Sequence, residues 1–193
     1  GHMNLTSANS INVARFLPQA FYYFNAYAQA KKLGKADNLT ICVPSGNFGN
    51  ITAGLFAQRM GLPIMNFIAA NNANDIFYNY LLSGIYSPKA SIQTIANAMD
   101  VGDPSNFARI LDLYKSSHAE ICNHISGATY SDDEIAATMK KCYEQTGYVL
   151  DPHGACGYQA LKDNLKEGET GVFLETAHPA KFKEKVDAIL STD

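Results

Sequence analysis

Apolar residues recur along the chain in two spacings, one typical of helices and the other of buried strands. Between residues 9 and 32 they return every three or four positions, as on one face of a helix. Ser10 could cap that helix, and Pro18 must kink it or begin a second one. Gly34 is a natural end for it. The pattern therefore predicts a helical opening segment with a break.

Two short apolar runs without charge follow, at residues 39–43 and 64–69, with helical spacing at 51–60 between them. Such runs are typical of strands that are covered on both faces. Strand, helix and strand in this order form a βαβ unit, so we expect a parallel sheet. A further strand is expected at residues 171–175.

Most of the remaining chain has helical spacing. It is mostly helical from residue 74 to 115, with turns at Gly84, Pro88 and residues 102–104. Further helices are expected at residues 132–143, 154–165 and 179–190, and a short strand could form at 149–150. No internal repeat or linker interrupts this order. We therefore expect a single α/β domain with a mostly parallel sheet flanked by helices.

Composition and charge narrow the functional classes. Of the 193 residues 47% are hydrophobic, and 15 Lys and Arg are scattered among 18 Asp and Glu. This balance argues against a nucleic-acid partner, and no apolar run reaches the roughly 18–20 residues of a membrane-spanning helix. Four cysteines without a CxxC pair, and no signal-peptide pattern, favour free thiols in the cytoplasm. Residues 1–3 resemble a cloning remnant, so we expect the domain to span 4–193.

The sharpest local motif is Ser-Gly-Asn-Phe-Gly-Asn at residues 45–50, between a predicted strand and a predicted helix. Amide groups at a helix N-terminus lack partners and favour anions, and glycines let the backbone approach a ligand closely. The motif therefore suggests a phosphate site, although it matches neither the Walker A pattern nor GxGxxG. A plain tight turn explains the same residues, and both interpretations stay open.

A second polar segment, Glu-Thr-Ala-His-Pro-Ala-Lys-Phe at residues 175–182, follows another predicted strand. Ligands of open α/β sheets bind beyond the carboxyl ends of strands, so Thr176, His178 and Lys181 are candidate site residues. The simpler explanation is a helix start, with Thr176 as its cap and Pro179 in its first turn.

Three further patterns have simple structural explanations. Helix capping explains one or two of the polar residues 7–12, and it is the simpler explanation for Asp151. His118, Cys122 and His124 could approach a metal, but no fourth ligand is nearby, and we expect no metal site. GxSxG and HExxH are missing from the sequence. On its residues alone, the chain offers a phosphate cup without a reactive group.

Six segments taken in order closely resemble the threonine synthase family, which consists of pyridoxal-phosphate enzymes of fold type II. They are SANSINVAR (7–15), VPSGNFGN (43–50), FIAANNANDI (67–76), SPKASIQTIANAMDVGDPSNFAR (87–109), GYVLDPHGA (147–155) and ETAHPAKF (175–182). The resemblance implies an enzyme that converts O-phospho-L-homoserine and water to L-threonine and phosphate. Its chemistry would be that of the cofactor, an electron sink for carbanions.

The resemblance also implies roles for individual residues. The cofactor phosphate would be held by Ser45, Gly46, Asn47, Phe48, Gly49 and Asn50, and Thr176 would hydrogen-bond the pyridine nitrogen. Residues that could lie near the substrate are Asn9, Ser10, Asn12, Lys89, Asn106, Arg109, His153, His178 and Lys181. Among these, Arg109 suits a phosphate best because its guanidinium presents a fork of donors.

One family feature is missing. The Schiff-base lysine of these enzymes lies in an amino-terminal stretch, a Phe-Lys-Asp run preceded by small residues, which this sequence lacks. The chain thus resembles roughly the carboxyl-terminal half of the enzyme, without its last tail. Without that amine we expect the chain alone to be inactive. Apolar surface that the other half would cover favours self-association.

Two other interpretations stay open. The chain could belong to another fold type II enzyme, such as a dehydratase or a cysteine synthase, although AMDV (98–101) and TAHPAKF (176–182) speak against this. Alternatively, it could be a non-catalytic phosphate-binding module that reuses the scaffold.

Overall fold

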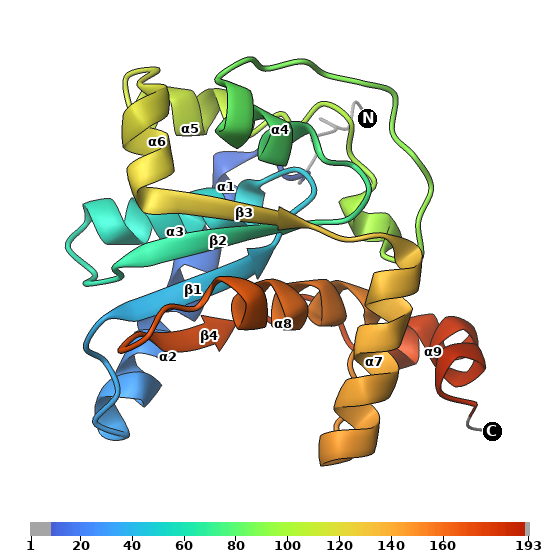
Figure 1. Cartoon of the computed structure of the whole chain (residues 1–193). Helices are drawn as coiled ribbons and strands as arrows, with labels where there is room; N and C mark the ends of the chain where they lie inside the picture. Colours follow the sequence, from blue (N-terminus) through green and yellow to red (C-terminus); the bar gives the residue numbers. More distant parts are fainter. Residues whose placement is uncertain (1–8, 192–193) are drawn as a thin grey trace, which may run out of the picture.

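A sheet of four parallel strands, in the order β3-β2-β1-β4, lies at the centre of the computed structural model (Figure 1). The strands are β1 (Leu39–Pro44), β2 (Asn66–Asn71), β3 (Ile125–Thr129) and β4 (Thr170–Phe173). The structure describes residues 9–191, so the tag-like residues 1–3 lie outside the described range. The predicted α/β class with a parallel sheet is confirmed.

Helices connect the strands and cover the sheet. The α-helices are α1 (Val13–Phe16), α2 (Ala20–Lys32), α3 (Gly49–Arg59), α4 (Ile76–Ser83), α5 (Phe107–Leu113), α6 (His118–His124), α7 (Asp132–Thr146), α8 (Pro152–Asn164) and α9 (Lys183–Leu190). Three short 3₁₀ helices are η1 (Leu17–Gln19), η2 (Asn97–Met99) and η3 (Pro179–Phe182). Within the described residues, no helix is both long and apolar enough to cross a membrane.

The pleat of β1 divides its side chains between two hydrophobic cores. Leu39, Ile41 and Val43 are fully buried in the core shared with α1 to α6, whereas Cys42 belongs to the core formed with α7, α8 and α9. Figure 1 shows α7 and α8 on one face of the sheet, with α2 and α3 on the other. Burial on both faces explains why the strand carries no charge.

The opening helical segment is broken at Pro18, as predicted. Pro18 lies in η1, between α1 and α2, and Gly34 adopts a left-handed φ of 68° just after α2 ends. The predicted cap is wrong, because the side chain of Asn12, and not that of Ser10, accepts the amide hydrogen of Ala14 at 2.9 Å. Ser10 instead accepts a hydrogen bond from Asn47.

The segment from Gly84 to Asn106 is mostly irregular, although helix was expected there. Hydrogen bonds between side chains hold this segment in place of the backbone hydrogen bonds of a helix. The buried Asn72 donates to Thr94 and to Asp100, each at 2.8 Å, and Asp100 accepts the Thr94 hydroxyl at 2.7 Å. These bonds join the segment to a residue distant in sequence, so helical spacing within the segment does not reveal them.

Other differences concern short elements. The strand β3 was not expected, because it begins directly where α6 ends and mixes small and polar residues. Residues 149–150 form no strand and lead into α8. The boundaries of β2 lie two residues later than the predicted 64–69, and those of α7 and α8 agree to within three residues.

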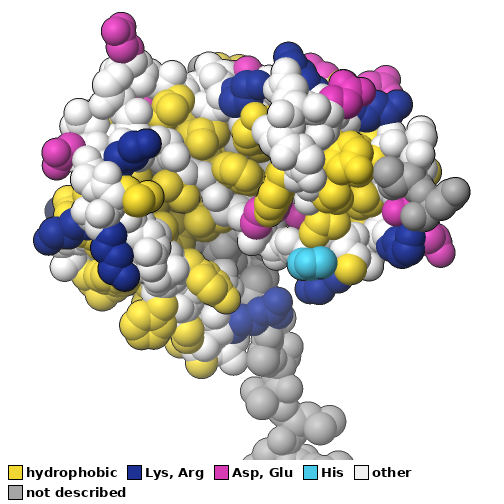
Figure 2. Space-filling model, turned by 90° about the horizontal axis from the view of Figure 1, so that it is seen from below, with side chains coloured by type: hydrophobic (Ala, Val, Ile, Leu, Met, Phe, Trp, Pro, Cys, Tyr) yellow, Lys and Arg dark blue, Asp and Glu magenta, His cyan; other side chains and the backbone are white. Residues whose placement is uncertain are grey.

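Apolar side chains are exposed around α2. Phe21 and Tyr22 are 73% and 67% exposed, and Val13 and Leu17 are also exposed just before them. Figure 2 views the molecule from below and shows apolar side chains gathered on that side, where α2 lies in Figure 1. Exposed apolar area of this extent is typical of a surface that contacts another protein segment.

Candidate functional site

The strand order locates the site. From β1 the chain passes to β2 and β3 on one side, whereas β4 pairs with β1 on the other side. The order reverses between β1 and β4, and ligands of open α/β sheets bind at the carboxyl ends of the strands at such a point. The loop 45–50 follows β1 and Thr176 follows β4, so the two predicted motifs meet there.

A cavity of about 200 Å³ lies at this point. Among the predicted residues it is lined by Ser10, Gly46, Asn47, Phe48, Gly49, Asn50, His153 and Thr176. Asn50 and Thr176 also line a larger neighbouring cavity of about 760 Å³ between the α1–α2 segment and the end of β4. Arg15 and Gln19 line both cavities and were not foreseen as site residues.

The loop presents backbone amides to the smaller cavity. Phe48 adopts a left-handed φ of 62° and buries its ring against Phe77, which turns the chain abruptly into α3. The amide groups of residues 46–50 donate no hydrogen bond to any group of residues 9–191. Free amides and the positive end of the helix dipole together suit an anion.

Two loop side chains brace the loop itself. The buried Ser45 hydroxyl donates to Asn50 Oδ1 at 3.0 Å, and Asn50 Nδ2 donates to the Pro44 carbonyl at 2.7 Å. The Tyr23 hydroxyl fixes the same turn by donating to the Asn50 carbonyl at 2.6 Å. These contacts fix the shape of the loop 45–50, which forms the phosphate cup, and a ligand there would be bound by the backbone amides.

The two glycines of the loop have different surroundings. A Cβ atom on Gly46 would lie 2.7 Å from the Met99 Cα and 2.8 Å from the Ala98 carbonyl oxygen, both in the η2 segment. A Cβ atom on Gly49 would meet nothing closer than 3.5 Å. Gly46 is therefore required by the close approach of two backbones.

Asn47 ties the loop to distant parts of the chain. Its Oδ1 accepts from the Ser105 amide at 2.6 Å, and its amide group donates to the Ser10 hydroxyl. Asn106 then bridges the carbonyl groups of Asn47 and Ser10, donating at 2.9 and 3.0 Å. The arrangement closes one side of the cup.

Arg109 holds this network rather than lining the cavity. Its guanidinium donates to the Asn106 side chain and to the Ile11 carbonyl, and it stacks 4.7 Å from the centre of the Phe16 ring. These partners occupy the fork of donors that made Arg109 the best predicted phosphate ligand. Its proposed contact with substrate stays a prediction.

His153 forms another wall of the cavity, and Asp151 fixes its orientation. Asp151 caps α8 by accepting the His153 amide at 2.8 Å, as expected, and its Oδ1 lies 2.6 Å from His153 Nδ1. Nε2 accepts the amide hydrogen of Ala98 at 3.1 Å, so the ring is the neutral tautomer that carries its proton on Nδ1. Both side chains are buried.

The two carboxyl groups next to His153, those of Asp151 and Glu175, have pKa values shifted in opposite directions. Burial alone would raise the pKa of Asp151, but its hydrogen bonds with the side chain and the backbone of His153 lower it below the ordinary value. Glu175 is exposed as a whole residue, but its carboxyl lies against the first turn of α8. Loss of water there, together with the negative charge of Asp151, raises the pKa of Glu175 to about 8. Glu175 lies immediately before Thr176, which is exposed toward the two cavities.

The remaining predicted residues do not line the smaller cavity. The side chain of Asn9 accepts the Ile11 amide at 3.1 Å. The Lys89 ammonium lies 3.5 Å from Asp75. His178, and not Thr176, caps η3 by accepting the Ala180 amide, and Lys181 lines a separate cavity of about 470 Å³.

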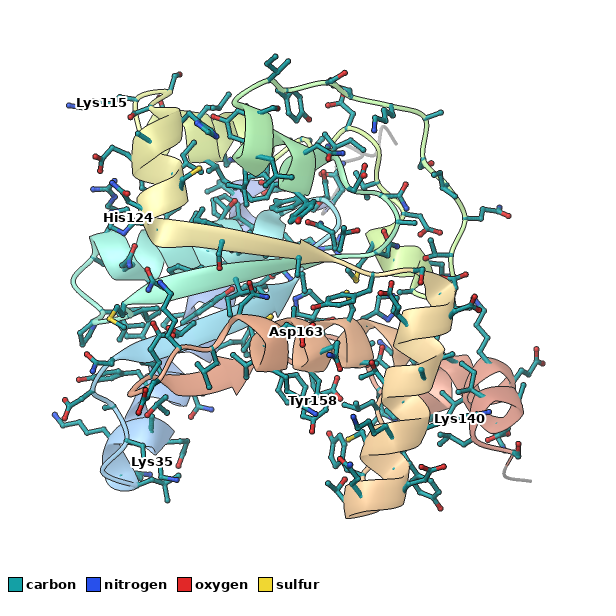
Figure 3. The ribbon with its side chains drawn as sticks, in the orientation of Figure 1. Lys35, Lys115, His124, Lys140, Tyr158 and Asp163 are labelled. Atoms are coloured by element: carbon teal, nitrogen blue, oxygen red, sulfur yellow. The ribbon has the colours of Figure 1, made fainter. Side chains whose placement is uncertain are left out.

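The three candidate metal ligands do not gather around one point. His118 Nε2 lies 3.3 Å from Cys122 Sγ, but it also contacts the carbonyl groups of α4. The centre of the His124 ring lies 5.5 Å from the centre of the Tyr114 ring. His124 lies next to the beginning of β3, at the edge of the sheet opposite the carboxyl ends of the strands (Figure 3). Within residues 9–191, no three His, Cys, Asp or Glu side chains are grouped to hold a metal ion.

Comparison with known proteins agrees with this geometry. The family model "Pyridoxal-phosphate dependent enzyme" matches residues 5–176. Threonine synthase of Haemophilus influenzae is 52% identical over 188 residues, which cover 97% of this chain and 44% of that protein. Threonine synthase of Saccharomyces cerevisiae is 37% identical, over 97% of this chain and 45% of that protein.

Solved structures give the same result. The crystal structure of threonine synthase from Escherichia coli superposes with a TM-score of 0.90 at 46% identity, covering 97% of this chain and 43% of that chain. Threonine synthase from Brucella melitensis, solved with pyridoxal phosphate bound, gives 0.86 at 38% identity and covers 94% and 44%. The chain therefore belongs to the pyridoxal-phosphate-dependent enzyme family, and within it corresponds to part of a threonine synthase, spanning about 44% of the length of these relatives.

Proposed function

We propose that this chain is the part of a threonine synthase that holds the cofactor phosphate, and that residues 4–193 form a single, partial cofactor-binding domain. The complete enzyme would convert O-phospho-L-homoserine and water to L-threonine and phosphate. The observation that supports the proposal best is the row of amides at residues 46–50, none of which donates to any group of residues 9–191. It lies at the N-terminus of α3 and at the switch between β1 and β4.

The cavity fits pyridoxal phosphate in chemical kind. A phosphate group matches the free amides of the loop, and the Thr176 hydroxyl on the same cavity would meet the ring nitrogen. When bound, this cofactor supplies an electron sink for carbanions. Thr176 is neutral and would not keep the ring nitrogen protonated as a carboxylate would, so we expect a milder sink.

The other residues of the wall orient the group that the amides bind. Asn47 and the Asn106–Arg109 pair close one side of the cavity, and His153 holds the η2 backbone on the other. Because no lysine of the family's Phe-Lys-Asp type occurs in the sequence, we propose that the 193-residue chain alone does not turn over substrate.

Two measurements on the purified chain test this proposal. Titration calorimetry with pyridoxal phosphate should show weak binding that inorganic phosphate competes away, whereas pyridoxal without its phosphate should not bind. An assay of phosphate release from O-phospho-L-homoserine, with the cofactor added, should stay at the buffer background. Absence of any cofactor binding, or turnover above background, would contradict the respective part of the proposal.

Two further expectations belong to the same proposal. The four cysteines are unpaired, which fits a reducing compartment, and we propose that the protein acts in the cytoplasm. The exposed apolar side chains around α2 favour self-association of the chain when it is studied alone.

A further inference from the structure

A buried carboxylate oxygen beside the cavity has no hydrogen-bond donor among the described residues. Asp151 is fully buried, and its Oδ1 is used by the amide and the Nδ1 of His153. Its Oδ2 accepts no hydrogen bond from any described group. Such an atom loses its hydration without compensation, so buried oxygens of this kind normally face a donor.

The carboxyl of Glu175 lies close to Asp151 at the start of α8. A Cβ atom on Gly154 would lie 1.9 Å from Glu175 Oε2 and 2.6 Å from Oε1, so the carboxyl rests directly on the first turn of α8. It also lies within hydrogen-bonding reach of Asp151. Two ionised carboxylates are both acceptors and repel each other, and a hydrogen bond between them requires one proton.

We propose that Glu175 carries a proton at neutral pH and donates it to Oδ2 of Asp151, and that this hydrogen bond positions the wall of the phosphate cup. Glu175 is a positioning residue in this scheme, since it acts on the cup through other residues. The inference does not depend on which phosphate compound the cup binds.

The contacts form a continuous path from Glu175 to the cup. The Asp151 carboxylate, satisfied at both oxygens, accepts the proton on Nδ1 of His153. That leaves Nε2 as the acceptor for the Ala98 amide, which holds η2 in place. The η2 backbone in turn lies against Gly46 with no room for a Cβ atom. One hydrogen bond therefore connects the segment after β4, through α8 and η2, to the loop 45–50.

The charged and titratable neighbours define the pH range. Burial and the charge of Asp151 raise the pKa of Glu175 to about 8, whereas a hydrogen bond with Tyr148 lowers it. His153 is the third titratable group at the junction, and Arg15 lines the larger cavity beside Glu175. Because the carboxyl of the unfolded chain titrates near 4.5, this proton stabilises the fold most at low pH. That stabilisation is lost between pH 4.5 and about 8.

The proton can be observed directly in the 193-residue chain. Carbon-13 NMR of glutamate-labelled protein, without any ligand, should show one side-chain carboxyl that titrates with a midpoint at about 8, well above the ordinary 4.5 of a glutamate. The variant Glu175→Gln should remove that signal, and Glu167→Gln, in the turn between α8 and β4, should leave it. A Glu175 signal with a midpoint near the ordinary 4.5 would overturn the proposal.

Urea unfolding at several pH values tests the positioning role. Between pH 4.5 and 8 the wild type should lose stability as the pH rises, whereas Glu175→Gln should lack this slope because its amide donates without titrating. At pH 6, Glu175→Ala should unfold at lower urea than Glu175→Gln. An unchanged slope in the Gln variant, or equal midpoints for Ala and Gln, would overturn the positioning role.

Ligand binding separates this inference from the proposed function. At pH 6 the Gln variant should bind inorganic phosphate as the wild type does, and the Ala variant should bind it at least several-fold more weakly. Equal phosphate affinity of the Ala variant would overturn the link to the cup. Failure of the wild type to bind phosphate would contradict the proposed function, while the NMR titration would still decide the protonation of Glu175.

Discussion

At the scale of single residues, the two glycines of the cup serve different ends, although they look alike in sequence. Gly46 has no space for a side chain because the backbone of Ala98 and Met99 lies within 2.8 Å of where its Cβ would be. Gly49 has ordinary van der Waals room and already lies in α3. Only Gly46 depends on being a glycine for steric reasons.

Substitution of these glycines should therefore give opposite results. Gly46→Ala should destabilise the chain by roughly 1–3 kcal/mol, as overpacking does, and should push η2 away from the cup, so that phosphate binding is lost. Urea unfolding and phosphate calorimetry would measure both effects. Gly49→Ala is the matched control for stability and should unfold at the same urea concentration as the wild type. Equal behaviour of the two variants would show that the contact with η2 is unimportant.

At the scale of elements, α7 has the most complete local signals. The Ser131 hydroxyl accepts a hydrogen bond from the Glu134 amide. In turn, the carboxylate of Glu134 accepts a hydrogen bond from the Ser131 amide at 2.8 Å. Hydrogen bonds from the backbone and side chain of Ser131 lower the pKa of Glu134. Acidic residues in the first turn also complement the helix dipole.

Loss of this cap should weaken the fold without touching the site. Ser131→Ala should lower the free energy of unfolding by about 1 kcal/mol, because an amide at the start of α7 loses its acceptor. Phosphate affinity should stay unchanged. Ser91→Ala, at an exposed position outside any helix, is the control and should shift stability by less than about 0.5 kcal/mol. A similar loss in both variants would argue against the cap.

Elements with their own local signals could be predicted from the sequence. The uncharged run of β1, the break at Pro18 and the dipole-matched charges of α7 each follow from neighbouring residues. The strand β3 could not be found, because its small residues become a strand only by pairing with β2. The irregular segment 84–106 depends on Asn72, which is distant in sequence.

The candidate site divides in the same way. The place of the cup could be predicted, since the loop 45–50 stands between a strand and a helix. The role of each side chain in the site could not be predicted from the sequence. Ser45 and Asn50 brace the loop, and Arg109 is bound by Asn106, because of contacts that only the folded chain brings together. Ala98 has no chemical signal in sequence, yet its backbone forms part of the wall.

At the scale of the whole molecule, the exposed apolar surface around α2 should govern solution behaviour. Phe21→Glu places a charge at a side chain that is 73% exposed, so it should reduce self-association without unfolding the chain. Sedimentation equilibrium over a range of protein concentrations would measure the change. Leu82→Glu, on α4 and 68% exposed, is the matched control and should leave association unaltered. Equal effects of both variants would mean that association is unspecific.

The bracing of the loop by its own side chains has a consequence for selectivity. Because the polar atoms of Ser45 and Asn50 bond within the turn, a phosphate bound there would meet main-chain N–H groups, which every amino acid except proline possesses. Backbone amides of this kind would recognise the charge and tetrahedral shape of a phosphoryl group, but not the molecule to which that group is attached. Discrimination between one phosphate ester and another must then arise at the far end of the guest, on the side of Thr176 and Arg15.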